Sequence, residues 1–180
     1  MKTHTAAFLV ALCSAASPLV AQTTPNIDNF ARVDSTYYRG AQPEGHDYAD
    51  LKALGVRTII NLTSDDAEPN EKAMAQSVGI KYVQIPMTTH TVPTSAQLSQ
   101  FLSLVNDPAD QPVYVHCVGG RHRTGVMTAV YRMTHEGWTA ARAFNEMKQY
   151  KFGADFLHSE FKNFVYSYHP ATVTARAAVR

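Results

Sequence analysis

Residues 113–125 have the sequence VYVHCVGGRHRTG, and this stretch decides the fold of the chain. Its first three residues are apolar and predict a buried strand, whereas the residues from Thr124 onward follow the spacing of a helix. A glycine-containing loop between a strand and a helix N-terminus turns backbone N–H groups toward a bound anion. The stretch therefore predicts a cradle for a tetrahedral oxyanion at the carboxyl end of a strand.

Cys117 opens this loop, and Arg123 closes it six positions later, directly before a hydroxyl residue, Thr124. A thiolate at the floor of an anion cradle is a nucleophile directed at phosphorus. Arg123 offers a planar fork for two phosphate oxygens and can stabilise the charge of the transition state. Thr124 can donate a hydrogen bond to the sulfur, and His116 is expected to order the loop rather than to act as a base. We predict Cys117, Arg123 and Thr124 as catalytic residues.

The backbone of the loop is the predicted binding site for the remaining phosphate oxygens. Gly119 and Gly120 permit close approach of the main chain and unusual dihedral angles. Arg121 and His122 flank this site, where they are expected to serve a second negative group of a substrate. The residues predicted to bind phosphate are Val118, Gly119, Gly120, Arg121, His122 and Arg123.

Strands and helices alternate along the rest of the chain. A short hairpin is predicted at 30–39, further strands at 56–62, 80–85 and 113–115, and helices near 48–54, 70–78, 94–105, 124–136, 139–150 and 157–168. This order predicts a single α/β domain with a mainly parallel central sheet of about four to five strands, flanked by helices. Ligands of such sheets bind beyond the carboxyl ends of strands. The loops after Leu62 and Ile85 should therefore lie near Cys117, and Asp107 and Asp110 should lie at the opposite edge.

The ends of the chain differ from this alternating region. The N-terminus carries one lysine, then an apolar run that includes Cys13, then small residues, which is the order of a secretory signal peptide too short to span a membrane. We predict cleavage after Ala21 and export to the periplasm or the medium. The predicted division is a signal peptide over 1–21, a polar lead-in over 22–29, a folded domain over 30–168 and a flexible tail over 169–180.

Composition limits the classes of function. Removal of the predicted signal peptide leaves 15 basic and 15 acidic residues, and a neutral chain is not expected to bind nucleic acid or a membrane surface. Cys117 is then the remaining cysteine, so an internal disulfide is excluded, and an exported chain that keeps one thiol is expected to use it. His158 and His169 lack the spacing of metal ligands, so no metal site is predicted.

The segment His116–Gly125 resembles the signature loop of cysteine-based protein tyrosine phosphatases, in particular their dual-specificity branch. Three further segments, 39–43, 56–62 and 150–153, resemble bacterial relatives of the plant-and-fungal atypical dual-specificity phosphatases. The resemblance covers residues 30–168. It implies a protein-tyrosine-phosphatase-like fold and hydrolysis of phosphate monoesters through a phosphocysteine intermediate, without a metal or another cofactor.

The resemblance leaves the substrate open. It favours activity on phosphorylated proteins or small phosphate esters, of the tyrosine or dual-specificity type. One alternative is an inositol polyphosphate or pyrophosphate phosphatase, although Val118 and Gly119 lack the extra basic residue typical of that group. An alternative of another class is a catalytically weak pseudophosphatase that only binds phosphate. The sequence does not indicate the oligomeric state.

The general acid is also open. Members of the family that have one carry an aspartate about thirty residues before the cysteine, whereas residues 84–93 contain no carboxylate and only His90 can titrate there. Three hypotheses follow: His90 is the acid, a carboxylate of the turn after residue 62 (Asp65, Asp66 or Glu68) is the acid, or the protein supplies none.

Overall fold

The structure is a computed structural model that describes residues 24–64 and 66–170. The predicted signal peptide with Cys13, the candidate acid Asp65 and most of the predicted tail lie outside this part. The strands are β1 (Ala31–Arg32), β2 (Tyr37–Gly40), β3 (Thr58–Asn61), β4 (Lys81–Gln84) and β5 (Val113–His116). The helices are α1 (Asp47–Ala53), α2 (Glu71–Ser77), α3 (Ser95–Asn106), α4 (Arg123–His135), α5 (Ala140–Gln149) and α6 (Ser159–Ser167).

The sheet has the strand order β1-β2-β5-β3-β4, so the strand that carries Cys117 lies at its centre. β5 pairs in parallel with β2 and β3, β4 extends the parallel part, and only β1 is antiparallel among the described strands. All four residues of β5 are buried, as expected for a parallel strand covered on both faces. The predicted fold class is confirmed.

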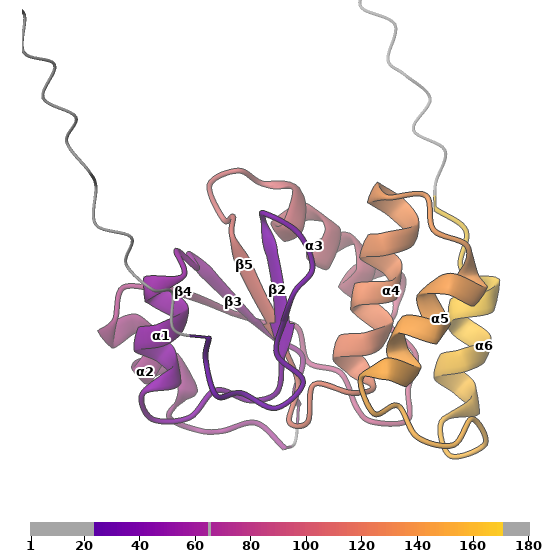
Figure 1. Ribbon diagram of the computed structural model, residues 1–180, viewed down its shortest axis with the longest axis horizontal. Helices are drawn as coiled ribbons and strands as arrows, with labels where there is room; N and C mark the ends of the chain where they lie inside the picture. Colours follow the sequence, from indigo (N-terminus) through magenta and orange to yellow (C-terminus); the bar gives the residue numbers. More distant parts are fainter. Residues whose placement is uncertain (1–23, 65, 171–180) are drawn as a thin grey trace, which may run out of the picture.

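Helices cover both faces of the sheet (Figure 1). α1 and α2 pack on one face through residues such as Leu51, Ala75 and Ile59. α3 and α4 pack on the other face through Phe101 and Val130, and α5 and α6 form a further layer against the outer side of α4. In the described part of the chain, every helix is too short or too polar to cross a membrane.

Local signals place most element ends correctly. Thr94 caps α3 with a full capping box, in which Gln97 bonds back to the Thr94 backbone. Gly55 follows α1 with φ +86°, the left-handed conformation that ends helices at glycine. α6 begins at Ser159 rather than at the predicted Leu157, because His158 has a non-helical backbone and residues 155–158 form turns.

The edge of the sheet opposite Cys117 is structural, as predicted from the position of Asp110. Its Oδ1 accepts hydrogen bonds from Thr58 Oγ1 at 3.1 Å and from Lys81 Nζ at 2.7 Å, at the amino ends of β3 and β4. The pairing ties two neighbouring strands together at the far end from the loop of residues 117–123. The edge at the carboxyl ends of the parallel strands, where Cys117 lies, has no such contact of Asp110.

Candidate active site

The loop 117–123, here called the phosphate loop, leaves the carboxyl end of β5 and enters α4 at Arg123. The Cys117 side chain is 3% exposed and is a free thiol at the floor of a cavity. The cavity is lined by Asp66, Thr89, Cys117, Val118, Gly119, Arg121, His122 and Arg123. The predicted loop residues other than Gly120 therefore surround the thiol.

Three consecutive carbonyls of the phosphate loop point away from the cavity, because groups around the end of β2 hold them. In a peptide unit the C=O and the following N–H point in opposite directions, so the N–H groups after these carbonyls are turned toward the cavity, as the anion cradle requires. The outward bonds are Gln42 N to Val118 O (3.1 Å), Asn29 Nδ2 to Gly119 O (2.7 Å) and Arg39 Nη2 to Gly120 O (2.7 Å).

Gly120 accounts for the close fit between the phosphate loop and β2. Its φ is +64°, and a Cβ at this position would lie 2.5 Å from the backbone carbonyl of Gly40. Gly40 has the same restriction, since a Cβ there would lie 2.2 Å from the Tyr114 hydroxyl. The backbone at the end of β2 therefore supports the phosphate loop.

Arg39 lies under the phosphate loop and was not predicted. It is fully buried, its guanidinium stacks 3.9 Å from the Tyr150 ring centroid, and Nη2 donates to Gly120 O. Burial lowers the pKa of Arg39, although its ordinary value is high enough that it keeps its charge. A fixed positive charge beneath the loop favours a bound dianion.

His116 makes a close, buried contact with Glu71, which sequence analysis also missed. The distance from His116 Nε2 to Glu71 Oε1 is 2.6 Å, and both side chains are fully buried. Glu71 Oε2 accepts a hydrogen bond from Asn61 Nδ2, and Asn61 Oδ1 accepts from the backbone and the hydroxyl of Thr63. His116 is thus held away from the cavity at the start of the loop, in agreement with the predicted ordering role.

Arg123 presents its fork to a carboxylate. Nη1 donates to Asp66 Oδ1 at 2.8 Å, Nη2 donates to Asp66 Oδ2 at 2.6 Å, and Nη1 also donates to Met87 O at 3.0 Å. Burial lowers the pKa of Arg123, but the bonds to Asp66 and the interaction with Cys117 together outweigh burial and leave this pKa raised. The same bonds lower the pKa of Asp66, which is therefore ionised in this state.

The candidate general acids differ in their position relative to the Cys117 cavity. Asp66 borders the Cys117 cavity, whereas Glu68 borders a neighbouring one and accepts a bond from the Asn70 backbone, as in a turn that precedes a helix. The His90 side chain is 72% exposed and faces Glu160, with 3.5 Å between His90 Nδ1 and Glu160 Oε1. Of the candidates that the structure describes, Asp66 alone lines the cavity.

Thr124 and His122 differ from their predicted contacts. The Thr124 hydroxyl is buried and has no hydrogen-bond partner among the described residues, so the predicted bond to sulfur is not formed here. His122 Nε2 donates to Phe152 O at 3.0 Å, which fixes the ring toward α6 rather than toward a second anionic group. Burial lowers the pKa of His122, which favours the neutral ring. Arg121 stays half-exposed, 3.9 Å from Asp28 Oδ2.

The chain is similar to proteins that are named as phosphatases. Relatives include the dual specificity protein phosphatase TpbA of Pseudomonas aeruginosa, 31% identical over 137 residues, which are 76% of this chain and 61% of TpbA. The inositol diphosphatase SIW14 of Saccharomyces cerevisiae is 28% identical over 130 residues, which are 69% of this chain and 46% of SIW14. This chain thus matches less than two thirds of the length of either relative.

Solved structures agree with this relation. The crystal structure of P. aeruginosa TpbA has a TM-score of 0.68 at 28% identity and covers 82% of this chain and 88% of TpbA. The core catalytic domain of SIW14 has a TM-score of 0.69 at 26% identity and covers 79% of this chain and 86% of that domain. A family model described as a DSP-PTPase phosphatase fused to NAD+ kinase matches residues 18–164. The chain belongs to this family of dual-specificity-type, cysteine-based phosphatases.

Proposed function

We propose that this protein hydrolyses phosphate monoesters through a phosphocysteine intermediate on Cys117. The observation that carries the proposal is the Arg123 fork, which already holds two coplanar oxygens of Asp66 at the cavity that contains the thiol. Two equatorial oxygens of a phosphate present the same pattern to a guanidinium. The cysteine-to-serine variant of TpbA has been solved in complex with phosphotyrosine, which supports an oxyanion substrate for the related loop of this chain.

The reaction takes two displacements at phosphorus. Cys117 Sγ attacks, the bond from phosphorus to the ester oxygen breaks, and the leaving oxygen takes a proton. Water then attacks the phosphocysteine, the phosphorus–sulfur bond breaks, and inorganic phosphate and the thiolate are released. Arg123 and the loop N–H groups stabilise the equatorial oxygens in both steps, and rotation of the buried Thr124 hydroxyl toward sulfur would improve the second leaving group.

Asp66 is the proposed general acid. A substrate phosphate must displace it from Arg123, and displacement removes the bonds that lower its pKa. The freed side chain, 36% exposed on its loop, then has a higher pKa beside the leaving oxygen and can carry the proton. His90 lacks this position in the described structure, since its ring faces Glu160.

The surroundings of the cavity favour phosphotyrosine-type esters over inositol polyphosphates. A second cavity adjoins the first and shares Asp66, Val118 and Gly119 with it. Neighbouring phosphates would meet negative charge there, whereas an uncharged ring could contact the half-exposed Val118. The further carboxylates of the second cavity are Asp28, Glu44, Asp47 and Glu68.

We also propose that the protein works after export, as the N-terminal segment 1–21 and the single remaining thiol suggest. This part of the proposal is independent of the chemistry. N-terminal sequencing of the protein recovered from a cell envelope fraction and from the medium would test it. An intact N-terminus on protein that stays in the cytoplasm would contradict it.

The experiment for the chemistry compares wild type with Cys117→Ser on para-nitrophenyl phosphate. We expect wild-type turnover, a loss of at least about a hundredfold in the variant, and retained vanadate binding, because the N–H cradle and Arg123 persist. Residual activity above about a hundredth of wild type would contradict a covalent mechanism. Phosphate binding without wild-type turnover would instead support the pseudophosphatase alternative.

A substrate panel tests the preference. Phosphotyrosine peptides, phosphoserine peptides and inositol polyphosphates should be compared by kcat/KM at one ionic strength. We expect the phosphotyrosine peptides to be hydrolysed most efficiently. A higher kcat/KM for inositol pyrophosphates would show that the acidic second cavity does not exclude polyanions.

A further inference from the structure

Three potential metal ligands meet beside the phosphate loop, although their spacing in the sequence predicts no metal site. His90 comes from the loop between β4 and α3, and His158 and Glu160 come from the start of α6. One ligand atom from each residue lies within 4.8 Å of the other two. His90 Nδ1 and His158 Nδ1 each lie 3.5 Å from the same oxygen, Glu160 Oε1.

These separations suit a tetrahedral ion. Zinc binds nitrogen and oxygen at about 2.0–2.2 Å, so two ligands of a tetrahedral zinc lie about 3.3 Å apart. The two nitrogen–oxygen distances already have nearly this length. The His90 side chain is 72% exposed, so its ring can rotate to bring the third edge to the same length.

Two of the three ligand atoms also lack any other partner. His158 Nδ1 and Glu160 Oε1 are buried from water and make no hydrogen bond within the described structure. Their contact with each other, at 3.5 Å, is longer than a hydrogen bond of normal length, so neither atom has a close partner. A cation between them would satisfy both atoms at once.

We propose that His90, His158 and Glu160 bind a divalent transition-metal ion, with zinc the best fit. Two imidazoles and one carboxylate are a typical zinc ligand set, whereas magnesium and calcium prefer oxygen ligands throughout. The exposed side of His90 leaves a fourth position for water. This inference goes beyond the proposed function, since hydrolysis at Cys117 requires no metal.

The location gives the ion a consequence for the active site. The His158 ring lies 3.8 Å, centroid to centroid, from that of His122 in the phosphate loop. A bound ion would link the loop that carries His90 to α6, next to residues that line the Cys117 cavity. It would also keep His90 away from the leaving group.

The test measures binding in the full chain with Cys117→Ser, so that the thiol cannot hold the metal. Zinc is titrated by calorimetry, and Co²⁺ is added as a probe whose absorption reports tetrahedral coordination. We expect one ion per chain and a loss of affinity of about 10- to 100-fold or more in His90→Ala and in Glu160→Gln. His46→Ala is the matched control, because His46 also lies 3.5 Å from a carboxylate, that of Asp50, and is 84% exposed.

The proposal would be overturned if His90→Ala and Glu160→Gln bound zinc as tightly as the parent. It would also be overturned if His46→Ala lost as much affinity as they do. Displacement of zinc by an equimolar amount of Mg²⁺ would overturn it as well, because it would indicate a nonspecific carboxylate site. Glu160→Gln keeps the size of the side chain, so a folded variant is expected. Amide exchange of residues 88–92 should slow when zinc is added to the parent and not when it is added to His90→Ala. None of these readouts uses catalysis, so failure here is separate from failure of the proposed hydrolase function.

Discussion

Helix α4 has one arginine at each end, and each arginine is bonded to carboxylate. The two sites differ in how firmly the carboxylate is held. Arg123 begins the helix and gives its fork to Asp66. Arg132 lies in the last turn and gives Nε and Nη2 to Glu146, at 3.1 and 2.8 Å. Both guanidinium groups have a raised pKa, because their partners together outweigh the effect of burial: Asp66 and Cys117 at Arg123, and Glu146 and Glu136 at Arg132.

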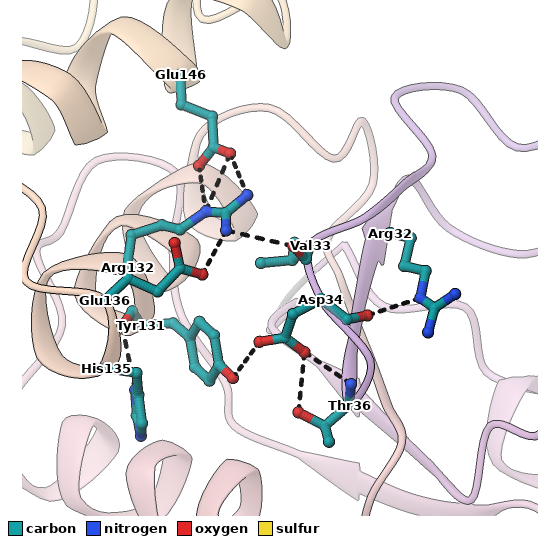
Figure 2. A network of polar contacts seen from close by, with 9 residues as sticks. All are labelled: Arg32, Val33, Asp34, Thr36, Tyr131, Arg132, His135, Glu136 and Glu146. Atoms are coloured by element: carbon teal, nitrogen blue, oxygen red, sulfur yellow. Dashed lines mark hydrogen bonds and ion pairs between the residues drawn. The ribbon is translucent and has the colours of Figure 1, made fainter.

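Figure 2 shows the Arg132 guanidinium between the carboxylates of Glu146 and Glu136 and the backbone of the hairpin. Nη1 also donates to Glu136 and to Val33 O, and the guanidinium lies 4.4 Å from the Trp138 ring centroid. Next to it, the Tyr131 hydroxyl donates to Asp34 in the turn before β2. The network joins α4, α5 and the hairpin, and the positive charge also suits the C-terminus of a helix.

Arg123 is held by Met87 O and by one carboxylate, that of Asp66, which can leave. Asp66 sits on the loop after β3 and is 36% exposed, whereas Glu146 sits on α5 and is 10% exposed. The same kind of arginine–carboxylate contact therefore has two different roles. A carboxylate on a packed helix holds an arginine permanently, and a carboxylate on an exposed loop holds one until an anion replaces it.

The largest expected effect is on kcat and concerns Arg123. Arg123→Lys should lower kcat for para-nitrophenyl phosphate by about 10²–10³, because a point charge cannot hold two oxygens as the fork does. Arg132→Lys is the matched control and should keep most of the kcat. Steady-state kinetics with both variants checks the difference. A lysine variant at position 123 with most of its kcat would remove Arg123 from the mechanism.

The next largest effect is on stability and concerns Arg132, at the C-terminal end of α4. Arg132→Leu leaves Glu146 nearly buried without its cation, and loss of one partner of such a pair costs up to about 3 kcal/mol in the free energy of unfolding. Urea unfolding should show this loss, while kcat of the folded variant stays near wild type. A large drop in kcat without a drop in stability would mean that the network acts on the active site.

The sequence predicted those features of the fold and the site that depend on neighbouring residues. The strand, phosphate loop and helix of residues 113–135 follow from periodicity and glycine, and the loop after Leu62 lies near Cys117 because both follow parallel strands. Alternation alone did not give the strand order, in which β5 separates β2 from β3. Without that order, no contact between the phosphate loop and the end of β2 could be expected.

The contacts that the sequence did not predict are those whose partners lie far along the chain. Arg39 bonds to Gly120, 81 positions away, and Asp66 bonds to Arg123, 57 positions away. One signal was available: Arg39 ends the predicted hairpin directly after two aromatic residues, and a charged side chain that a strand buries must have a partner. Glu71 gave no such signal, because acidic residues are common in the first turn of a helix.

Asp66→Asn tests whether the carboxylate competes with substrate for Arg123. We expect vanadate to bind up to about tenfold more tightly at neutral pH, because an amide leaves the fork more readily than a carboxylate does. The pKa of Asp66 is lowered in the folded state, so its contact is complete above its unfolded pKa of about 3.9 and is lost as pH falls through the lower folded value. Unchanged vanadate affinity would show that Asp66 does not compete.

The smallest expected effect tests the charge of the second cavity. Glu68→Lys reverses one charge on its wall and should raise kcat/KM for inositol polyphosphates by about threefold, the equivalent of ~0.65 kcal/mol, while para-nitrophenyl phosphate is affected less. The gain is modest because the side chain faces water and salt screens it. Asp107→Lys is the control, since it makes the same charge reversal at the opposite edge of the sheet and should leave both substrates unchanged. An equal gain in both variants would trace the effect to net charge, and the second cavity would then have no part in the choice of substrate.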